Sequence, residues 1–296
     1  MSSDPARAFT ARSLLFVPGD SPRKLEKASA AGADLLLVDL EDAVAEGVKA
    51  EARKTVRAFL DAAPDTGERP WVRVNPLDTP HTLDDLAAIV PGRPGGIMLP
   101  KVRSRADVET VDHYLSALEA AAGVTRGSIH IIIVATETAE GLFSIGSYAG
   151  APRLAAMTWG AEDIATALGA LTNRQEDGSY DHPYQLCRTL CLAGAAAARV
   201  PGIETIHGNF RDVAGLERIA SAARSAGFRG MMAIHPDQVA TINRAFTPSD
   251  DEVAKAQRIV DLFAANPGLG TIGMDGEMLD APHLKRAQAT LALVGR

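Results

Sequence analysis

The segment "DLLLVDLEDAVAEGVKAEARKTVRAFLDAA" (residues 34–63) places a short apolar run directly before a longer helical pattern. Residues 35–38 are four consecutive apolar residues, which is typical of a strand that is buried on both faces. Three carboxylates, Asp39, Glu41 and Asp42, follow at the end of this run. Because neighbouring like charges repel one another, we expect a positive group close to them. The segment therefore predicts a β–α unit with an acidic cluster where its strand ends.

The same order of strand and helix recurs along the chain. We expect eight strands, at residues 13–19, 34–42, 71–75, 96–101, 129–138, 154–163, 203–209 and 230–236. Eight β–α units are the count of a closed (β/α)8 TIM barrel. The alternative, an open doubly wound sheet, is disfavoured because no G-x-G-x-x-G follows the first strand. We predict an α/β barrel domain over residues 1–245.

The pattern changes after residue 245. Residues 246–296 predict one amphipathic helix with a capped start, a short turn-rich element and a last helix. These residues lie outside the eight-unit count. We therefore expect a C-terminal helical extension that acts as a lid or an oligomerisation arm.

Composition narrows the class of protein. The net charge of −7 over 296 residues argues against a nucleic-acid-binding protein, which usually carries a basic face. The longest apolar stretches, such as residues 131–135, are too short to span a membrane, and "MSSDPARAFTARS" lacks the apolar core of a secretory signal. The spacing of Cys187 and Cys191 matches neither a zinc site nor a disulfide framework. We expect a cytoplasmic protein with reduced thiols and no membrane or nucleic-acid partner.

Polar residues gather where the predicted strands end, which is the catalytic end of a TIM barrel. A single acid there is about as often a helix cap as a ligand, but several acids on one rim indicate a bound cation. Oxygen ligands without cysteine favour Mg²⁺ or Mn²⁺. Arg73 is a planar donor suited to a carboxylate or a developing oxyanion. The set comprises Asp39, Glu41, Asp42, Arg73, Asn75, Lys101, Glu137, Glu162, Asp163, His207, Asn209 and His235.

Two further features have alternative interpretations. Arg23, Lys24 and Lys27 begin the helix after the first strand, either as a solvated face or as a clamp for phosphates at a helix N-terminus. His207 and His235 either orient loops or take part in chemistry. The residue types alone leave both pairs of alternatives open.

Eight segments in order make the chain similar to a known family. They are "SLLFVPGDSPRKLEKA", "VDLEDAV", "VRVN", "MLPKV", "ATETAEGL", "WGAEDIATALG", "GFRGMMAIHPDQV" and "MLDAPHLKRA". Together they resemble the citrate lyase β-subunit-like proteins of the HpcH/HpaI aldolase superfamily, a group of CoA-ester lyases that includes malyl-CoA and citramalyl-CoA lyases. The resemblance runs from about Arg12 to the end of the chain.

The resemblance implies Mg²⁺-dependent cleavage or formation of a carbon–carbon bond. The implied substrate is a 3-hydroxy-dicarboxylic acyl-CoA thioester, which yields an acyl-CoA and a 2-oxo acid. It also implies a homo-oligomer, a trimer or a hexamer, with a shared active site. Roles carried over by motif are metal binding for Glu137 and Asp163, the substrate oxyanion for Arg73, support for Asp39, Glu41 and Asp42, CoA phosphates for Arg23, Lys24 and Lys27, and proton transfer by Asp280 from a neighbouring subunit.

Three alternatives to a stand-alone CoA-ester lyase stay open. They are a citrate lyase β subunit acting on a carrier-protein thioester, a malyl-CoA thioester hydrolase and a non-catalytic regulatory paralogue. The basic residues at 23–27 favour the stand-alone enzyme, and a regulatory paralogue is expected to have lost a metal ligand or Arg73. Asn209 and His207 depart from the residues common in relatives, and we expect them to alter the acyl pocket.

Overall fold

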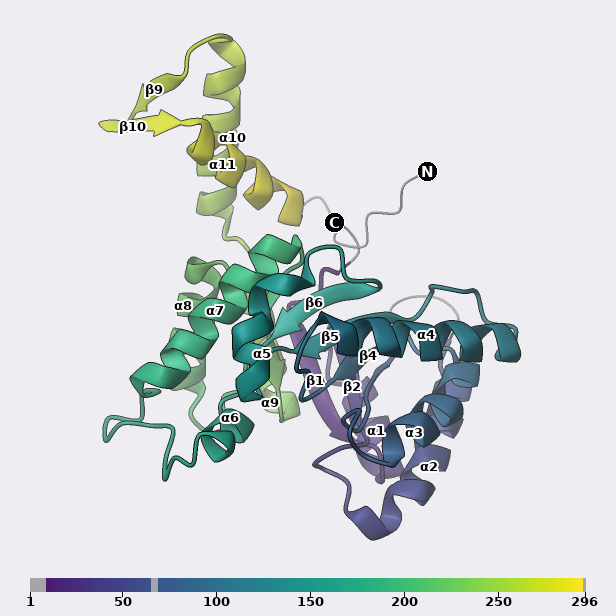
Figure 1. The fold of residues 1–296 in the computed structure, drawn as a ribbon. Helices are drawn as coiled ribbons and strands as arrows, with labels where there is room; N and C mark the ends of the chain where they lie inside the picture. The colour runs from purple at the N-terminus through teal and green to yellow at the C-terminus, as the bar shows by residue number, and fades with distance from the viewer. Residues whose placement is uncertain (1–8, 65–68, 295–296) are drawn as a thin grey trace. The chain divides into compact units, whose positions relative to one another are not determined.

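The computed structural model describes residues 9–64 and 69–294 of the chain. Most of the N-terminal segment in which no secretory signal was found lies outside these residues. Among the described residues, no helix is long and apolar enough to cross a membrane. Eight strands form a closed barrel at the centre of the first part of the chain (Figure 1). They are β1 Ser13–Pro18, β2 Leu35–Asp39, β3 Trp71–Arg73, β4 Gly96–Leu99, β5 His130–Val134, β6 Leu154–Thr158, β7 Gly202–Glu204 and β8 Gly230–Ala233.

All strand pairs of the barrel are parallel and follow the order of the sequence. The barrel closes where β8 pairs with β1, with Ser13 opposite Met231. The register between β2 and β3 places Asp39 opposite Arg73. The predicted (β/α)8 barrel is therefore confirmed, and its register already brings two of the predicted site residues together.

The barrel interior is apolar until the strands end. Alternate residues of a strand point to the same face, and Leu35 and Leu37 of β2 belong to the interior cluster. The next alternate residue is Asp39, so the same periodicity carries this carboxylate to the mouth of the barrel. Glycine is required at position 96, the first residue of β4, because a Cβ there would come within 2.4 Å of the Trp71 ring.

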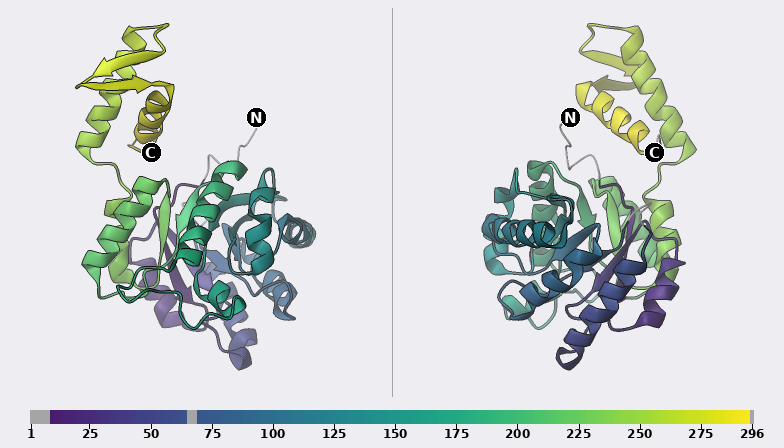
Figure 2. Two further views of the ribbon diagram at one scale, coloured as in Figure 1. Left: turned by 60° about the vertical axis from the view of Figure 1, so that its left-hand side comes forward. Right: turned by 90° about the vertical axis from the view of Figure 1, so that its right-hand side faces the viewer.

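Helices surround the barrel, and neighbouring helices such as α2, α3 and α4 contact one another (Figure 2). Burying one face of each helix against the strands follows from their amphipathic patterns. The elements are α1 Pro22–Ser29, η2 Glu46–Val48, α2 Lys49–Ala62, α3 His81–Ile89, η3 Val90–Gly92, α4 Arg105–Ala122, α5 Ala139–Ser144, η4 Ile145–Tyr148, α6 Glu162–Ala167, α7 His182–Ala198, α8 Val213–Ala226 and α9 Pro236–Ala245. Cys187 and Cys191 of α7 are buried free thiols.

The observed strands end earlier than the sequence pattern suggests. β2 ends at Asp39 and β4 at Leu99, so Glu41 and Lys101 lie in the loops that follow. Likewise Glu137 follows β5, and Asp163 lies in the first turn of α6. The site is thus built mainly on the loops at the carboxyl ends of the strands.

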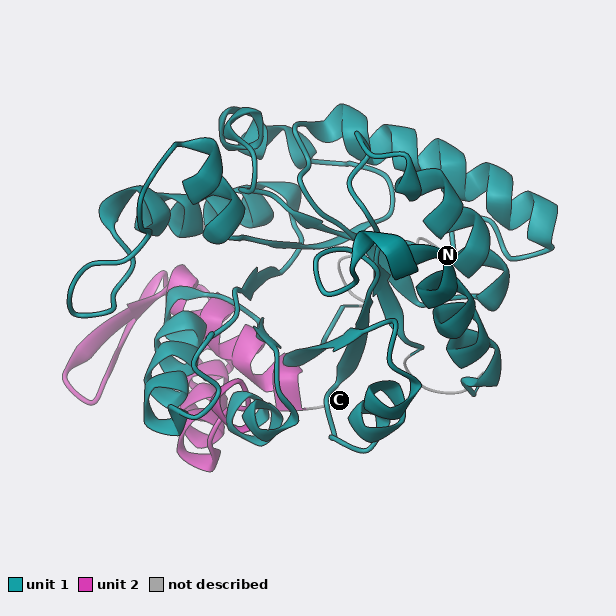
Figure 3. Cartoon of the chain, turned by 90° about the horizontal axis from the view of Figure 1, so that it is seen from below, with its two compact units in different colours: residues 1–243 teal, residues 244–296 magenta. Residues whose placement is uncertain are grey.

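The chain divides into two compact units, residues 1–243 and residues 244–296, which Figure 3 shows in different colours. The second unit contains α10 Asp250–Ala265, β9 Thr271–Met274, β10 Glu277–Asp280 and α11 Ala281–Val294. Ser249 begins α10 with the expected capping box. An apolar cluster that includes Ile259, Met274 and Leu279 holds this unit together.

The extension is not purely helical as expected. Its turn-rich element is an antiparallel hairpin of β9 and β10, in which Met274 pairs with Glu277. Asp275 and Gly276 between them both have positive φ angles, of 50° and 82°. An Asp-Gly pair with these angles suits the tight turn of a two-residue hairpin loop. The Asp-Gly pair was therefore the feature of the sequence that indicates this hairpin.

Candidate active site

The acids of β2 are bound by the arginine of the next strand. Arg73 donates Nε–H to Asp39 Oδ1 at 2.8 Å and Nη2–H to Asp39 Oδ2 at 2.6 Å. Its Nη1 lies 2.9 Å from Glu41 Oε2 and 3.6 Å from Asp42 Oδ2. Burial disfavours the guanidinium charge, but Asp39 and its neighbours more than offset this and raise the pKa of Arg73. Asp39 and Arg73 therefore form a two-pronged ion pair at the barrel mouth.

Backbone and side-chain donors hold the loop after β2 in one conformation. Asp39 also accepts hydrogen bonds from the backbone N–H groups of Glu41 and Ala43. From behind, the buried ammonium of Lys49 donates to the carbonyls of Leu40 and Glu41, at 2.9 Å each. The Asp39 carboxylate and the Lys49 ammonium thus fix the direction in which the Glu41 side chain leaves the backbone.

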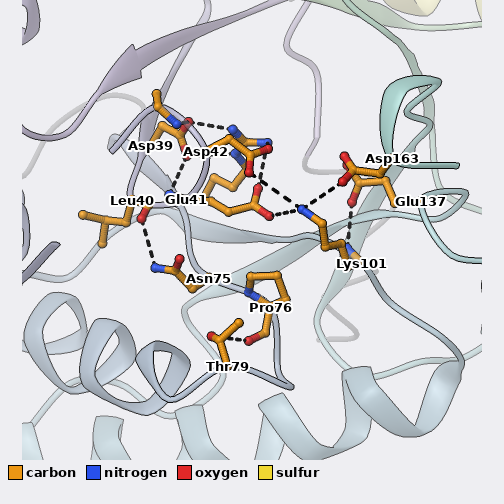
Figure 4. A network of polar contacts seen from close by, with 12 residues as sticks. Asp39, Leu40, Glu41, Asp42, Asn75, Pro76, Thr79, Lys101, Glu137 and Asp163 are labelled. Atoms are coloured by element: carbon orange, nitrogen blue, oxygen red, sulfur yellow. Dashed lines mark hydrogen bonds and ion pairs between the residues drawn. The ribbon is translucent and has the colours of Figure 1, made fainter. Parts of the chain in front are cut away.

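Lys101 links this loop to the opposite side of the rim. Its ammonium lies 2.5 Å from Glu41 Oε1, 3.8 Å from Asp42 Oδ1 and 3.2 Å from Asp163 Oδ1 (Figure 4). Its backbone N–H donates to Glu137 Oε2 at 2.7 Å. One residue therefore touches four of the five carboxylates that the sequence placed on this rim.

Glu137, on the loop after β5, and Asp163, in the first turn of α6, lie beside each other (Figure 4). Thr136 holds these loops together, because its hydroxyl donates to the Gly160 carbonyl and accepts from the Gly160 N–H, both at 3.1 Å. Gly160 leaves room for the acid, since a Cβ there would lie 3.2 Å from Glu137 Oε1. The Lys101 backbone N–H thus positions Glu137, whereas Asp163 has only a share of the Lys101 ammonium.

The electrostatics of the rim are unbalanced. Five carboxylates, Asp39, Glu41, Asp42, Glu137 and Asp163, face the two cations Arg73 and Lys101. Burial, together with the charges of Glu41 and Asp163, raises the pKa of Glu137 to about 8. Burial also raises the pKa of Glu41, although Arg73 and Lys101 oppose the shift. The surplus of negative charge lies around Glu137, where a cation would relieve it.

A pocket of about 450 Å³ opens beside these acids. Polar side chains line one part of it, namely Asp39, Asp42, Arg73, Glu137, Glu162, Asp163 and Thr205. Most of the rest is apolar, with Phe16, Val17, Pro18, Met98, Val134, Trp159, Ile206, Met232 and Ile234. The pocket can therefore hold a ligand that has both a charged and an apolar end.

An aromatic pair closes the pocket on the side of β6. Trp159 and Tyr180 both line the pocket and meet edge to face, with ring centroids 5.1 Å apart. The buried carboxylate of Glu204 on β7 fixes Trp159, since it accepts the indole N–H at 2.6 Å, and it also accepts from Arg188. This wall gives the pocket a defined apolar shape.

Four further residues of the site were not predicted from the sequence, namely Lys49, Trp159, Tyr180 and Glu204. Lys49 begins α2, where a lysine is usually solvated, and no spacing distinguishes it. Tyr180 lies in the irregular segment after α6. Trp159 directly follows the observed β6 and Glu204 ends the observed β7, but the predicted strands, 154–163 and 203–209, continued past both residues and hid this signal.

Several predicted residues lie on other elements of the chain. Arg23, Lys24 and Lys27 are exposed on α1, and within the described chain no ion pair engages their charges. Asp280 ends β10 in the second unit, and its Oδ1 lies 2.5 Å from His283 Nδ1. His207 and Asn209, which we expect to alter the acyl pocket, do not line the pocket described above, and this expectation stays a prediction.

His235 has the structural role that was one of its two interpretations. Its Nδ1 accepts a hydrogen bond from the Asp237 N–H at 3.2 Å, and its ring stacks on Phe210 with centroids 4.6 Å apart. It does not line the pocket either. These contacts order the loop after β8.

Comparison with known proteins agrees with this arrangement. The family model described as HpcH/HpaI aldolase/citrate lyase matches residues 12–236, which is most of the barrel. The chain belongs to this family. It is thereby placed among carbon–carbon lyases of the CoA-ester group.

The relatives match almost the full length of the chain. A citrate lyase subunit beta-like protein of Mycobacterium tuberculosis is 34% identical over 282 residues, covering 95% of this chain and 94% of the relative. A (3S)-malyl-CoA thioesterase of Cereibacter sphaeroides is also 34% identical, over 293 residues, covering 97% and 95%. The crystal structure of M. tuberculosis CitE with magnesium, acetoacetate and coenzyme A has a TM-score of 0.80 at 32% identity and covers 98% of this chain and 100% of that one.

Proposed function

We propose that this protein is a Mg²⁺-dependent lyase that cleaves or forms a carbon–carbon bond in a 3-hydroxy-dicarboxylic acyl-CoA thioester, of the kind of malyl-CoA or citramalyl-CoA. The products of cleavage are an acyl-CoA and a 2-oxo acid. The observation that carries the proposal is the pair Glu137 and Asp163, two adjacent carboxylates without a full counter-charge at the edge of a pocket that Arg73 also lines.

The residues present fit a divalent metal. Glu137 and Asp163 would hold Mg²⁺, with Mn²⁺ as an alternative, and both offer the hard oxygen donors that these ions prefer. Among the described residues, no group of three His, Cys, Asp or Glu side chains could hold a metal. The remaining positions would go to substrate and water, as Mg²⁺ sites commonly have them. A bound Mg²⁺ supplies Lewis-acid stabilisation of negative charge on substrate oxygen. Two neighbouring M. tuberculosis structures were solved with magnesium, CitE together with acetoacetate and coenzyme A, and a citrate lyase beta subunit together with oxaloacetate.

Arg73 is suited to stabilise the enolate of the departing acyl thioester. Two of its five N–H donors, Nε–H and one on Nη2, bind Asp39, and Nη1 forms an ion pair with Glu41 without a hydrogen bond. This leaves two donors on Nη1 and one on Nη2. Because Asp39 fixes the plane of the guanidinium, these remaining donors need little reordering when charge develops on the thioester oxygen. Preorganised donors of this kind lower a barrier by roughly 3–4 kcal/mol.

Asp280 is the proposed base that moves a proton to or from the carbon next to the thioester. The hydrogen bond from His283 holds the pKa of Asp280 below its usual range, so the carboxylate is ionised near neutral pH. We propose that it completes the site of a neighbouring subunit, in a trimer or a hexamer. General acid–base transfer of this kind contributes about 10²–10⁴-fold in rate.

Arg23, Lys24 and Lys27 are the proposed contacts for the CoA phosphates. All three are exposed on α1, which directly follows β1 and therefore begins at the catalytic end of the barrel. The absence of ion pairs to these side chains among the described residues leaves their charge available to phosphate. The CitE neighbour named above was solved with coenzyme A.

The direct test is a condensation and cleavage screen. Purified protein with Mg²⁺ is incubated with acetyl-CoA or propionyl-CoA and each of a panel of 2-oxo acids. The acyl-CoA products are separated by chromatography and identified by mass spectrometry. We expect one pair to give a 3-hydroxyacyl-CoA in a Mg²⁺-dependent reaction. The proposal would be contradicted if no pair condensed and if neither malyl-CoA nor citramalyl-CoA were cleaved.

A thioester hydrolase is the second candidate, because relatives named (3S)-malyl-CoA thioesterase match as well as the citrate lyase-like ones. The same assay separates the two activities. A lyase releases acetyl-CoA and a 2-oxo acid from malyl-CoA, whereas a hydrolase releases free CoA and malate. Free CoA is measured with a thiol reagent, and acetyl-CoA by mass.

Subunit mixing tests the shared site. Asp280→Ala and Arg73→Ala chains are each expected to be inactive alone. When they are mixed under conditions of proven subunit exchange, some sites receive an intact Asp280 and an intact Arg73, so activity should return. No recovery in the exchanged mixture would show that Asp280 serves the barrel of its own chain or none.

A further inference from the structure

Lys101 stands out because it contacts the site in two ways at once. Its ammonium lies 3.2 Å from Asp163 Oδ1 and 2.5 Å from Glu41 Oε1. Its backbone N–H donates to Glu137 Oε2 at 2.7 Å. The same residue therefore binds both proposed metal ligands, one through its side chain and one through its backbone.

The backbone of Lys101 is held in a conformation that a lysine rarely adopts. Its φ angle is +52°, in the left-handed region where a residue with a Cβ is disfavoured. A non-glycine residue in such a conformation costs on the order of 1–3 kcal/mol and persists where surrounding contacts maintain it. Here those contacts are the bonds to Glu41, Asp163 and Glu137. The contacts of Lys101 with these three acids therefore maintain its strained backbone conformation.

The position of Lys101 argues against a role in holding substrate. Asp39, Arg73, Glu137 and Asp163 line the pocket, but Lys101 does not. Its ammonium lies among carboxylates of the loops after β2, β5 and β6, and Figure 4 shows it between Glu41 and Asp163. What it touches is the acidic cluster, and so its effect must act through those acids.

We propose that Lys101 is a positioning residue that serves as an internal counter-cation: in the metal-free protein its ammonium binds Asp163, and Mg²⁺ competes with it for that carboxylate. The inference rests on the proposed metal site. The ammonium keeps its bond to Glu41 when Asp163 turns to the metal, so Lys101 also anchors the loop after β2 in the loaded protein.

Two consequences have opposite signs and make the proposal testable. Without the ammonium, five carboxylates face Arg73 alone, so the metal-free protein loses stability. The same change removes a positive charge next to the metal position and frees Asp163, so Mg²⁺ should bind more tightly. At an effective dielectric constant of about 20, a unit charge a few ångströms away accounts for an affinity change on the order of tenfold.

The experiment measures metal-free melting temperature and Mg²⁺ affinity by calorimetry, with Mg²⁺ alone as the probe. Lys101→Met removes the charge and keeps the length of the side chain, and we expect a lower metal-free melting temperature and about tenfold tighter Mg²⁺ binding. Lys101→Gly removes the charge and also relieves the positive φ angle, so it should bind Mg²⁺ as tightly and lose less stability. Lys101→Arg keeps the charge and should bind Mg²⁺ about as wild type does.

The matched control is Lys54→Met, which removes an equally long cation that pairs with Glu51 on the exposed face of α2. It should leave the metal-free melting temperature unchanged and the Mg²⁺ affinity within about twofold of wild type. Equal or weaker Mg²⁺ binding by Lys101→Met and Lys101→Gly, while wild type binds, would overturn the inference and leave the proposed function standing. No Mg²⁺ binding by wild type would overturn both.

Discussion

The two halves of the barrel rim carry similar acids in very different surroundings. On the side of β2 and β3, Asp39 accepts four hydrogen bonds, two of them from Arg73. On the side of β5 and β6, Glu137 accepts one backbone N–H, and Asp163 shares the ammonium of Lys101 with Glu41. Around β2 and β3, three acids face both Arg73 and Lys101, whereas Glu137 and Asp163 have only a share of the Lys101 ammonium as a counter-charge.

This difference separates structural carboxylates from metal-binding ones. A buried acid that is paired with arginine stabilises the fold and orients its partner, whereas a buried acid without a full counter-charge favours a cation from solution. It also answers which positive group lies near Asp39, Glu41 and Asp42. That group is Arg73 together with Lys101, and these acids orient the two cations instead of facing an uncompensated site.

The largest effect is expected from breaking the Asp39–Arg73 ion pair, on the side of the rim where the acids are paired with cations (the paired half). Asp39→Ala leaves the buried guanidinium of Arg73 without its main partner, which should lower the free energy of unfolding by about 3–5 kcal/mol. Urea denaturation with a single cooperative transition measures it. Asp34→Ala is the matched control, since it breaks the more exposed Arg12–Asp34 pair and should cost about 1 kcal/mol or less. Equal losses would show that burial does not distinguish the two pairs.

The next largest effect concerns catalysis. Arg73→Lys keeps a positive charge beside Asp39 but removes the planar donors aimed at the developing enolate, so kcat should fall by about 10²–10³-fold. Steady-state kinetics with the substrate pair from the screen measures it. Arg12→Lys changes the Arg12–Asp34 pair in the same way, outside the pocket, and should keep kcat near the wild-type value. A kcat within about threefold of wild type for Arg73→Lys would contradict its role.

A smaller effect is expected in the pH dependence of stability, and it concerns Glu137 on the side of β5 and β6. Because burial raises the pKa of Glu137 from 4.5 to about 8, the metal-free folded protein keeps a proton that the unfolded chain releases between these values. The contribution of Glu137 to stability is therefore fully present below about pH 4.5 and is lost as pH rises to about 8. Glu137→Gln should match wild type near pH 5 and melt about 5 °C higher near pH 8, without metal.

Gln keeps an oxygen that can accept the Lys101 N–H, so the variant tests the charge rather than the hydrogen bond. Scanning calorimetry in the presence of a chelator follows the difference across pH. A melting difference between the two proteins that is the same at pH 5 and pH 8 would show that Glu137 is not held neutral. With Mg²⁺ added, the order at pH 8 should reverse, since only wild type gains from the metal.

The barrel itself could be predicted from sequence because hydrophobic strands and helices alternate in a simple order. The eight strands and their parallel arrangement are confirmed, whereas the hairpin at Asp275 and Gly276 was overlooked because alternation over four residues is a weak signal. Strand ends were placed too late by a few residues. Polar residues directly after a buried run extend the pattern without extending the ladder of hydrogen bonds.

The gathering of polar residues at one rim could also be predicted, but their pairing could not. Asp39 meets Arg73 because the register of β2 and β3 sets them opposite each other, and register depends on the whole barrel. Lys49 acts through backbone carbonyls, and the loop of Lys101 has a left-handed conformation; neither feature leaves a spacing in the sequence. The roles of Glu137, Asp163 and Asp280 stay predictions.

The most direct test of the central claim is a Mg²⁺ titration that compares two acids of the same rim. Asp163→Asn should weaken Mg²⁺ binding by about 100-fold or more, because it removes a proposed ligand. Asp42→Asn removes an equal charge beside Arg73 and Lys101 and should stay within about threefold of wild type. Calorimetry in a metal-free buffer gives both values. If Asp42→Asn loses as much affinity as Asp163→Asn, the division of the rim into a paired half and a metal-binding half is wrong.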